Sequence, residues 1–259
     1  MSLRSFANHA RRSIADAGAS VIEFCYPSIC CVCDRPASAG SRWCAACESE
    51  LAELQLAPAC DVCAMPLAEH LAPCPYCEGK GLKPFDCIAR LGIFASPLKE
   101  LIHQVKYRND WPLGERLAER LAGQDSVRAI LADTDVIVPV PLYWKRHARR
   151  GFNQAETIAA VLAKRSNAKL RRAVVRLRDT PTQTAMHKRA QRLENLKNAF
   201  GTIDPSAIKG QRVLLIDDVI TTAATLQTLA REIRRHDPAS ISVAVLAIAD
   251  PKGRAFEVI

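Results

Sequence analysis

Eight of the eleven cysteines fall into two copies of one pattern, Cys-x2-Cys-x10-Cys-x2-Cys, and each cysteine of the second copy follows its counterpart by 30 positions. A Cys-x2-Cys pair turns both sulfurs towards one metal ion, and two pairs complete a tetrahedron. Four thiolates leave no open coordination position, so we expect two structural zinc sites. The expected ligands are Cys30, Cys33, Cys44 and Cys47 in the first copy and Cys60, Cys63, Cys74 and Cys77 in the second.

The other three cysteines, Cys25, Cys31 and Cys87, fall outside the pattern and are expected to be packing residues. Cys31 could replace Cys30 as a ligand, although the spacing favours Cys30. The sequence leaves open whether each copy closes its own site or the two copies interlace, and we expect sequential pairing. Clustered cysteines in a chain without a secretory signal favour metal binding over disulfides.

No stretch of the chain reaches 18 apolar residues, so no transmembrane helix is expected. The N-terminal segment 14–24 is interrupted by Asp16 and Glu23, whereas a secretory signal needs an unbroken apolar core of about 7–15 residues. We therefore expect a cytoplasmic protein. The sequence gives no indication of the oligomeric state.

The positive charge is concentrated in one segment. Residues 144–197 contain 15 lysines and arginines against three acidic residues, a local balance of +12, while the rest of the chain sums to −3. If both cysteine sites bind zinc, the formal charge of +9 falls to roughly +5, because each site then carries about −2. A localised cationic segment indicates a compact anionic partner.

The chain divides by composition into three predicted parts. Residues 1–24 are expected to form a basic helix or tail, residues 25–85 a double zinc ribbon, and residues 86–259 an α/β domain. The ribbon segment is poor in bulky apolar groups, so it needs the metal to fold. Zinc supplies an apparent folding free energy of about 10–16 kcal/mol in small finger peptides.

Strand and helix patterns alternate in the third part, which predicts an open, mostly parallel sheet with helices on both faces. Sheets of this kind bind ligands beyond the carboxyl ends of their strands. The predicted strands are 87–94, 136–139, 170–178, 212–216 and 241–249, and the predicted helices are 98–107, 113–122, 154–165 and 224–235.

One apolar strand leads into two carboxylates, a turn rich in hydroxyl groups and a helix. Backbone amides at the helix N-terminus, together with Thr221, Thr222 and Thr225, suit a phosphate group. Asp217 and Asp218 precede that turn and could accept hydrogen bonds from sugar hydroxyls. The segment therefore predicts a pocket for a ribose 5-phosphate. The alternative is that these residues only cap the following helix.

This segment resembles the 5-phosphoribosyl-1-pyrophosphate (PRPP) signature of type I phosphoribosyltransferases, and other segments resemble the ComF family specifically. With the cysteine repeat, the resemblance covers nearly the whole chain from about residue 24. The further segments are Lys106-Tyr107, Val138–Leu142, Arg150-Gly-Phe-Asn-Gln154 and Arg178–Gln183 followed by Arg192 and Asn195.

The resemblance implies a type I phosphoribosyltransferase-like domain that binds PRPP with magnesium and transfers the phosphoribosyl group to an unidentified acceptor. Arg149 and Arg150 are then candidates for stabilising the leaving pyrophosphate, and 178–195 for a hood over the ligand. The implied PRPP-binding residues are Asp217, Asp218, Thr221, Thr222, Ala223, Ala224, Thr225, Val140 and Pro141.

Position 223 departs from the family pattern, because Ala223 stands where Thr-Thr-Gly is usual. If the backbone there needs a positive φ, alanine costs about 1–2 kcal/mol.

Two other functions stay open. The protein could bind PRPP or a nucleotide without turnover, as a sensor or adaptor, or it could handle single-stranded DNA together with proteins of the DNA-uptake machinery. The resemblance implies a link to natural transformation. Aromatic residues interleaved with basic ones favour single-strand binding, but the basic segment contains only Trp144 and Phe152 besides histidine.

Overall fold

The computed structural model of the chain describes residues 28–38, 40–67, 73–179, 198–221 and 223–249. Contacts divide the chain into two compact units, Met1–Ala52 and Glu53–Ile259. The basic helix predicted for residues 1–24 lies outside the described residues, and the domain boundaries predicted after residues 24 and 85 stay predictions. Within the described ranges, no helix has the length and apolar composition needed to cross a bilayer.

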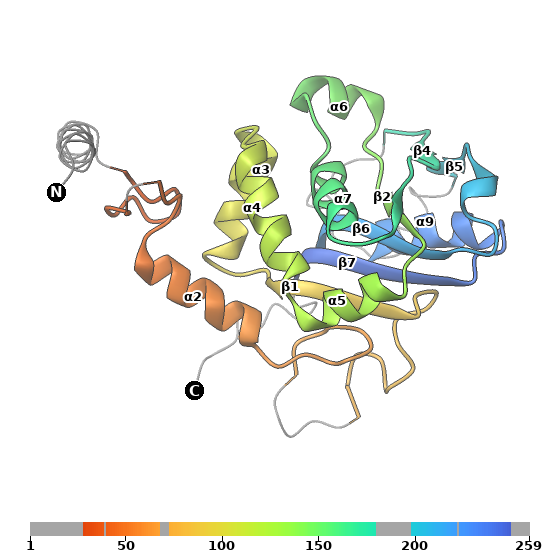
Figure 1. Cartoon of the computed structure of the whole chain (residues 1–259), viewed down its shortest axis with the longest axis horizontal. Helices are drawn as coiled ribbons and strands as arrows, with labels where there is room; N and C mark the ends of the chain where they lie inside the picture. The colour runs from red at the N-terminus through yellow and green to blue at the C-terminus, as the bar shows by residue number, and fades with distance from the viewer. Residues whose placement is uncertain (1–27, 39, 68–72, 180–197, 222, 250–259) are drawn as a thin grey trace, which may run out of the picture. The chain divides into compact units, whose positions relative to one another are not determined.

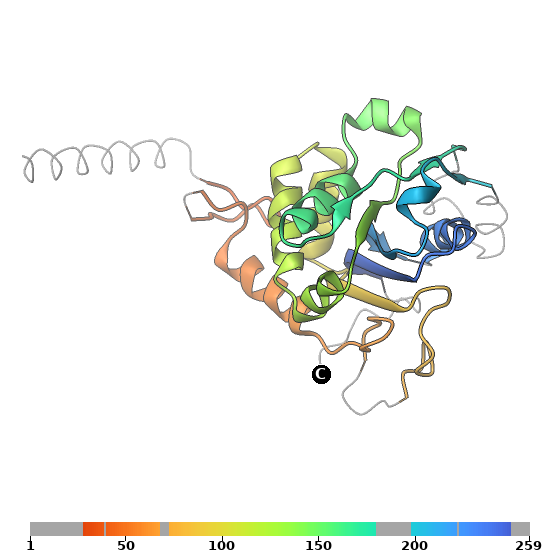
Figure 2. The same cartoon turned by 45° about the vertical axis from the view of Figure 1, so that its right-hand side comes forward.

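Five parallel strands in the order β1-β7-β6-β2-β3 form the main sheet of the second unit. In Figure 2 the yellow strand β1 lies beside the dark blue β7 at the edge of this sheet. The predicted parallel architecture is therefore confirmed. The strands are β1 (Cys87–Ile93), β2 (Val136–Pro139), β3 (Lys169–Leu170), β6 (Arg212–Ile220) and β7 (Ser240–Ile248).

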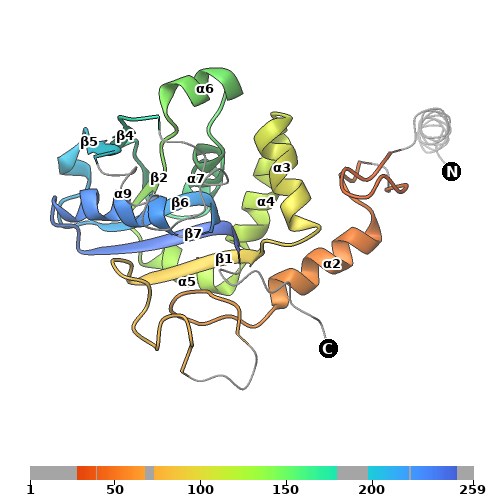
Figure 3. The ribbon, with the colours of Figure 1, turned by 180° about the vertical axis from the view of Figure 1, so that it is seen from behind.

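Helices cover both faces of the sheet. Helices α4 and α7 pack against each other and lie over β2, β6 and β7, whereas α9 lies on the opposite face (Figures 1 and 3). Helix α6 stands apart from the sheet (Figure 1) and buries no residue. The helices are α3 (Leu98–Tyr107), α4 (Trp111–Ala122), α5 (Asp125–Ala132), α6 (Trp144–Arg150), α7 (Gln154–Lys164) and α9 (Ala224–Arg234).

The core consists of strands that are buried on both faces. In β6 the run Val213–Ile216 is fully buried, and in β7 the run Val243–Ile248 is buried as well. Such continuous apolar runs are typical of parallel strands between two helical layers. Each fully buried Val, Leu or Ile contributes about 1.5–3 kcal/mol, so these two strands hold the centre of the fold together.

The prediction of a single strand over 170–178 is wrong. Strand β3 ends at Leu170, and β4 (Val174–Arg176) belongs to a separate two-stranded sheet with β5 (Phe200–Thr202). The β4–β5 pair is antiparallel, and a short 3-10 helix (Pro205–Ala207) follows it. The chain therefore leaves the main sheet between the two strands, where the sequence shows only continuous β propensity. Residues 180–195, which make up most of the hood implied by the family resemblance, lie outside the described residues.

Both copies of the cysteine repeat form the same backbone turn. An isolated bridge joins Ile29 to Pro36 in the first copy, and another joins Ala59 to Pro66 in the second. Each bridge residue of the second copy again follows its counterpart by 30 positions. Helix α2 (Ala45–Leu56) follows the first turn. The internal repeat is therefore a repeat of structure as well as of sequence.

The second cysteine turn is part of the Glu53–Ile259 unit, where it covers the edge strand of the sheet. The amide of Ile88 in β1 donates to the carbonyl of Val62, at 3.0 Å. The buried guanidinium of Arg90 donates to the carbonyl of Ala57, at 3.2 Å. Unpaired edge strands are open to association with other chains. The turn thus closes one edge of the sheet.

Candidate functional site

The acidic pair lies inside strand β6, one residue past the point where its neighbour ends. The sequence predicted a strand ending at Ile216, but β6 continues because β7 pairs with it as far as Ile220. On the other side, β2 ends at Pro139, opposite Ile216. Asp217 and Asp218 therefore stand at the carboxyl edge of the sheet, where the strand order leaves room for a ligand.

The two carboxyl groups have different environments. Burial, followed by the charge of Asp218, raises the pKa of Asp217 to about 7. The backbone amide of Asp218 donates to Oδ1 of Asp217 at 2.9 Å, and this bond acts in the opposite direction, as do the charges of Lys106 and Arg176. A carboxyl group with a raised pKa therefore lies at this edge beside a second carboxylate, and a perturbed pKa is typical of functional sites.

Two cations from other elements act on the pair, Lys106 and Arg176, and a third, Arg146, lies near Arg176. Nζ of Lys106, in the last turn of α3, lies 2.9 Å from Oδ2 of Asp218. Arg176, in β4, is partly buried, with its guanidinium 5.5 Å from the ring of Phe200. Nε of Arg146, in α6, lies 3.1 Å from a carboxylate oxygen of Asp179. The site thus combines carboxylates with a partly buried cationic wall.

The turn after β6 matches the predicted phosphate loop in position. Helix α9 begins at Ala224, so its first N–H groups point back towards Thr221 and the acidic pair. Ala223 has φ +56°, in the left-handed region, and it is the N-cap residue of α9. The positive φ that would make alanine costly is therefore present. Thr222 lies outside the described residues, and Thr225 occupies the first turn of the helix.

The loop predicted to hold pyrophosphate lies beside the acidic pair. The amide of Val140 donates to the carbonyl of Ile216 at 2.8 Å, which places Val140 and Pro141 next to Asp217. The side chain of Asn153 then fixes this loop: Nδ2 donates to the carbonyl of Val140 at 3.0 Å, and Oδ1 accepts from the amide of Ala155 at 3.1 Å. Asn153 is therefore a cap of α7 that also holds the loop.

The Arg150-Gly-Phe-Asn-Gln154 segment links α6 to α7. Gly151 has φ +75° and ends α6, so a residue without a Cβ suits this position. The guanidinium of Arg150 lies 5.7 Å from the ring centroid of Tyr107, whereas Arg149 is exposed on α6. The role predicted for these two arginines stays a prediction. Lys106 and Arg176 were given no role from sequence, because only the folded chain brings them to the pair.

Each cysteine cluster fits a structural zinc ion. The four sulfurs of each copy lie within 4.8 Å of one another, in the sequential pairing expected from the repeat. Within the first cluster, Sγ–Sγ distances of 3.6–3.7 Å join Cys30 to Cys47 and Cys33 to Cys44 and Cys47, and in the second cluster distances of 3.7–3.8 Å join Cys60 to Cys77 and Cys63 to Cys74. A tetrahedron with Zn–S bonds of about 2.3 Å has edges of about 3.8 Å. The donor set and its spacing therefore suit tetrahedral Zn²⁺.

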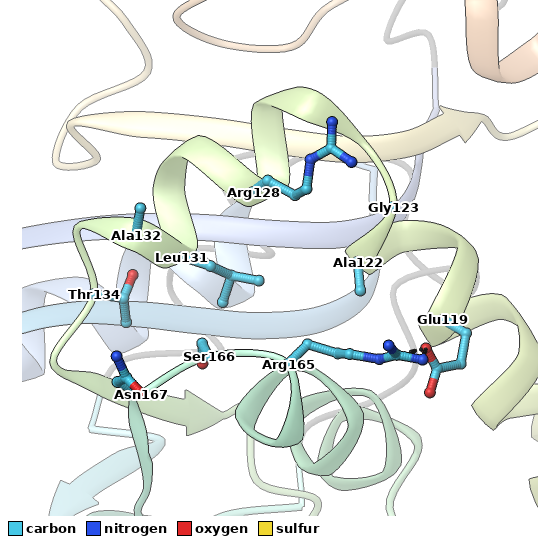
Figure 4. Close-up of a pocket in the computed structure, with 10 residues that line it drawn as sticks. All are labelled: Glu119, Ala122, Gly123, Arg128, Leu131, Ala132, Thr134, Arg165, Ser166 and Asn167. Carbon is cyan, nitrogen blue, oxygen red and sulfur yellow. Dashed lines mark hydrogen bonds and ion pairs between the residues drawn. The ribbon is translucent and has the colours of Figure 1, made fainter.

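A separate cavity of about 590 Å³ lies at the opposite edge of the sheet (Figure 4). Two of its lining residues, Thr134 and Asn167, lie two positions before the first residues of β2 and β3, so the cavity is at the amino ends of those strands. Its two arginines are already neutralised: Arg165 pairs with Glu119 at 2.7 Å (Figure 4), and Arg128 pairs with Asp125. This cavity is remote from the acidic pair and presents no excess charge to an ionic ligand.

Two family models match the chain. The phosphoribosyl transferase domain matches residues 109–258, and the double zinc ribbon domain matches residues 21–78. The first covers the acidic pair, its turn and the loop after β2. The second covers all eight cysteines of the repeat. The comparison therefore agrees with both parts of the architecture.

Curated relatives are similar over most of their own length. DNA utilization protein YhgH of Escherichia coli K12 is 32% identical over 224 residues, which are 84% of this chain and 95% of that protein. Competence protein F of Haemophilus influenzae is 32% identical over 80% of this chain and 90% of that protein. Competence protein ComFC of Bacillus subtilis is 28% identical over 78% and 87%, respectively.

Proposed function

The chain belongs to the ComF family, in which a double zinc ribbon precedes a phosphoribosyl transferase domain, and on that premise we propose that it binds PRPP with magnesium at Asp217 and Asp218. The observation that supports this most is the position of the partly buried acidic pair in β6, on the strand that leads into the N-terminus of α9. Carboxylates suit the ribose hydroxyls, and helix amides suit the 5-phosphate.

The proposed reaction is transfer of the phosphoribosyl group to a base or amine acceptor. A nitrogen lone pair attacks C1 of the ribose, the bond from C1 to oxygen breaks, and pyrophosphate leaves with that electron pair. Magnesium supplies charge neutralisation at the pyrophosphate oxygens. Asp217 and Asp218 orient the ribose. The loop at Val140 and Pro141 holds the leaving group, and Arg149 and Arg150 stabilise its charge.

Thermal unfolding with a panel of ligands tests this proposal. Magnesium with PRPP should raise the Tm more than magnesium with ribose 5-phosphate or pyrophosphate alone, by about 5–10 °C when PRPP is present at a hundred times its Kd. The Asp217→Asn/Asp218→Asn variant should lose this shift. Equal Tm shifts for the variant and the wild type would mean that PRPP does not bind at the acidic pair. Binding without pyrophosphate release from any acceptor would favour a non-catalytic sensor of PRPP.

A second candidate function is binding of single-stranded DNA, and the surface around α6 favours it. We call this the α6 surface: Tyr107, Tyr143, Trp144, Lys145 and Arg150. Tyr107 is 69% exposed and Trp144 is 63% exposed. Lys145 lies 5.6 Å from the Trp144 ring, and the Tyr143 and Trp144 rings are 5.7 Å apart. Exposed aromatic rings among cations suit bases that stack and phosphates that pair.

We further propose that the protein acts in the cytoplasm, on DNA or with the proteins that import it. The relatives named for competence and DNA utilization support this role. Unoxidised cysteine clusters suit a reducing compartment. The PRPP site and the α6 surface share Arg150, and their other side chains differ.

Fluorescence anisotropy with a labelled oligothymidylate tests the second candidate. Trp144→Ala should weaken binding by about tenfold or more, since stacking of one base contributes about 1–3 kcal/mol. Arg128→Ala, an exposed arginine at the opposite edge of the sheet, is the matched control and should bind as the wild type does. If Trp144→Ala also binds as the wild type does, the α6 surface is not a DNA site.

A further inference from the structure

Helix α3 places one lysine directly on the acidic pair. One face of the helix is buried, which fixes its rotation about its own axis and leaves Lys106 facing β6. Nζ of Lys106 lies 2.9 Å from Oδ2 of Asp218, and the two side chains are only 20% and 15% exposed. The residues of the buried face are Leu98, Leu101, Ile102 and Val105.

The end of α3 is also held from the side of α6. Tyr107 receives the guanidinium of Arg150 at 5.7 Å and forms an edge contact with His103, also at 5.7 Å. These contacts of Tyr107 hold in place the C-terminal end of α3, which carries Lys106. The ion pair joins a helix that precedes the matched phosphoribosyl transferase domain to the carboxylates inside it, since the match begins at residue 109.

Few charged groups other than Lys106 act on the two carboxyl groups of the acidic pair. Arg176, from β4, is the other cation whose charge lowers the pKa of Asp217. Arg176 is partly buried, and the charged groups that act on it are Arg146, Asp217 and Asp179. On α3, burial lowers the pKa of His103 and the nearby Lys106 lowers it further, so at neutral pH the imidazole adds no competing positive charge.

We infer that Lys106 is a positioning residue of the ribose site: it orients the Asp218 carboxylate towards the ligand and places a positive charge beside the acidic pair, and it is supplied by a helix outside the matched domain. The inference rests on the proposed function, because it assigns Lys106 to the same site. Water screens an ion pair less when both side chains are largely enclosed. The Lys106–Asp218 ion pair is therefore stronger than an exposed surface pair.

The first test needs no ligand. Carboxyl carbon NMR of ¹³C-labelled aspartate follows protonation of the pair in the wild type, Lys106→Met, Lys106→Arg and Lys99→Met. Loss of the lysine charge should raise the midpoint of the first protonation by about one pH unit, and arginine should restore it. Lys99 is an exposed lysine on the same helix, so its substitution should leave the midpoint unchanged.

The second test measures the affinity for magnesium and PRPP with the same variants. Lys106→Met should weaken binding at least tenfold and move its pH limit upward with the NMR midpoint, while Lys106→Arg keeps most of the affinity. An unchanged midpoint in Lys106→Met overturns the inference, whatever the ligand result. A wild type without affinity for PRPP, but with a shifted midpoint in the variant, overturns the proposed function and leaves the charge role of Lys106 standing.

Discussion

At the scale of single residues, Ala223 is an alanine at a position where the backbone conformation favours glycine. Its φ of +56° lies in the left-handed region, where a Cβ is unfavourable. Alanine is 7% exposed there, so the strain is held by the surrounding fold. The turn that we propose for the ribose phosphate is therefore a strained turn.

Replacing this alanine should relieve the strain. Ala223→Gly should raise the free energy of unfolding by about 0.5–1 kcal/mol, because relief of the left-handed strain exceeds the entropy that glycine adds to the unfolded chain. Urea unfolding measures this difference. The matched control is Ala224→Gly at the first position of α9, which should destabilise the protein by about 0.5–1 kcal/mol. A less stable Ala223→Gly variant contradicts the account of the turn.

At the scale of elements, the second cysteine turn and strand β1 depend on each other. The first cluster has a cation of its own, since Arg35 interacts with Cys33. The corresponding position in the second copy is Met65, which carries no charge. Arg90 of β1 supplies the positive charge near the second cluster instead. It is 6% exposed, and its charge interacts with Cys63. The sheet thus supplies the cation that balances the second thiolate cluster.

Zinc release under a chelator measures this dependence. Arg90→Met should speed the loss of one of the two zinc ions and lower the Tm, because a tetrathiolate of charge about −2 loses its buried counter-charge. Arg90→Lys should have a rate of zinc release and a Tm between those of Arg90→Met and the wild type. Arg35→Met should speed release from the other cluster with little effect on the sheet. If Arg90→Met releases zinc at the wild-type rate, the second cluster does not use the cation of β1.

Some elements follow directly from the sequence, and others depend on their partners. Helix α3 and strand β2 have the predicted bounds, because their apolar periodicity matches the faces they bury. Helix α6 was not predicted, since it buries no residue and so carries no periodic pattern. The end of β6 was placed too early, because pairing with β7 overrides the low β propensity of two aspartates.

In the candidate site, too, some features follow from the local sequence and others depend on partners from distant parts of the chain. The acidic pair and its turn are local in sequence, so the residues themselves predicted them, whereas the loop at Val140 was implied by the family resemblance. The contact between Lys106 and Asp218 joins distant parts of the chain, and no local pattern indicates which lysine reaches a given carboxylate. The zinc ligands were the most predictable feature, since a repeated spacing determines them completely.

At the scale of the whole molecule, the second cysteine turn belongs with the sheet, and the two compact units meet at residues 52 and 53. A fragment of residues 53–259 should therefore fold with one bound zinc and keep most of the wild-type Tm. A fragment of residues 86–259 should be far less stable, because it lacks the bonds to Ile88 and Arg90 that cover the sheet edge. Calorimetric unfolding and zinc analysis distinguish the two fragments. Equal stability would contradict the structural role of the second turn.

The central claim is that the carboxylates of β6 hold a phosphoribosyl ligand, and isothermal titration calorimetry of the zinc-loaded protein with magnesium and PRPP tests it most directly. The account predicts saturable binding at one site per chain. It also predicts that the Asp217→Asn/Asp218→Asn variant loses this binding while keeping the wild-type Tm without ligand, and that Arg128→Gln, at the remote edge of the sheet, retains it. A wild type that binds no PRPP at millimolar concentration, or a double variant that binds it as the wild type does, would contradict the claim.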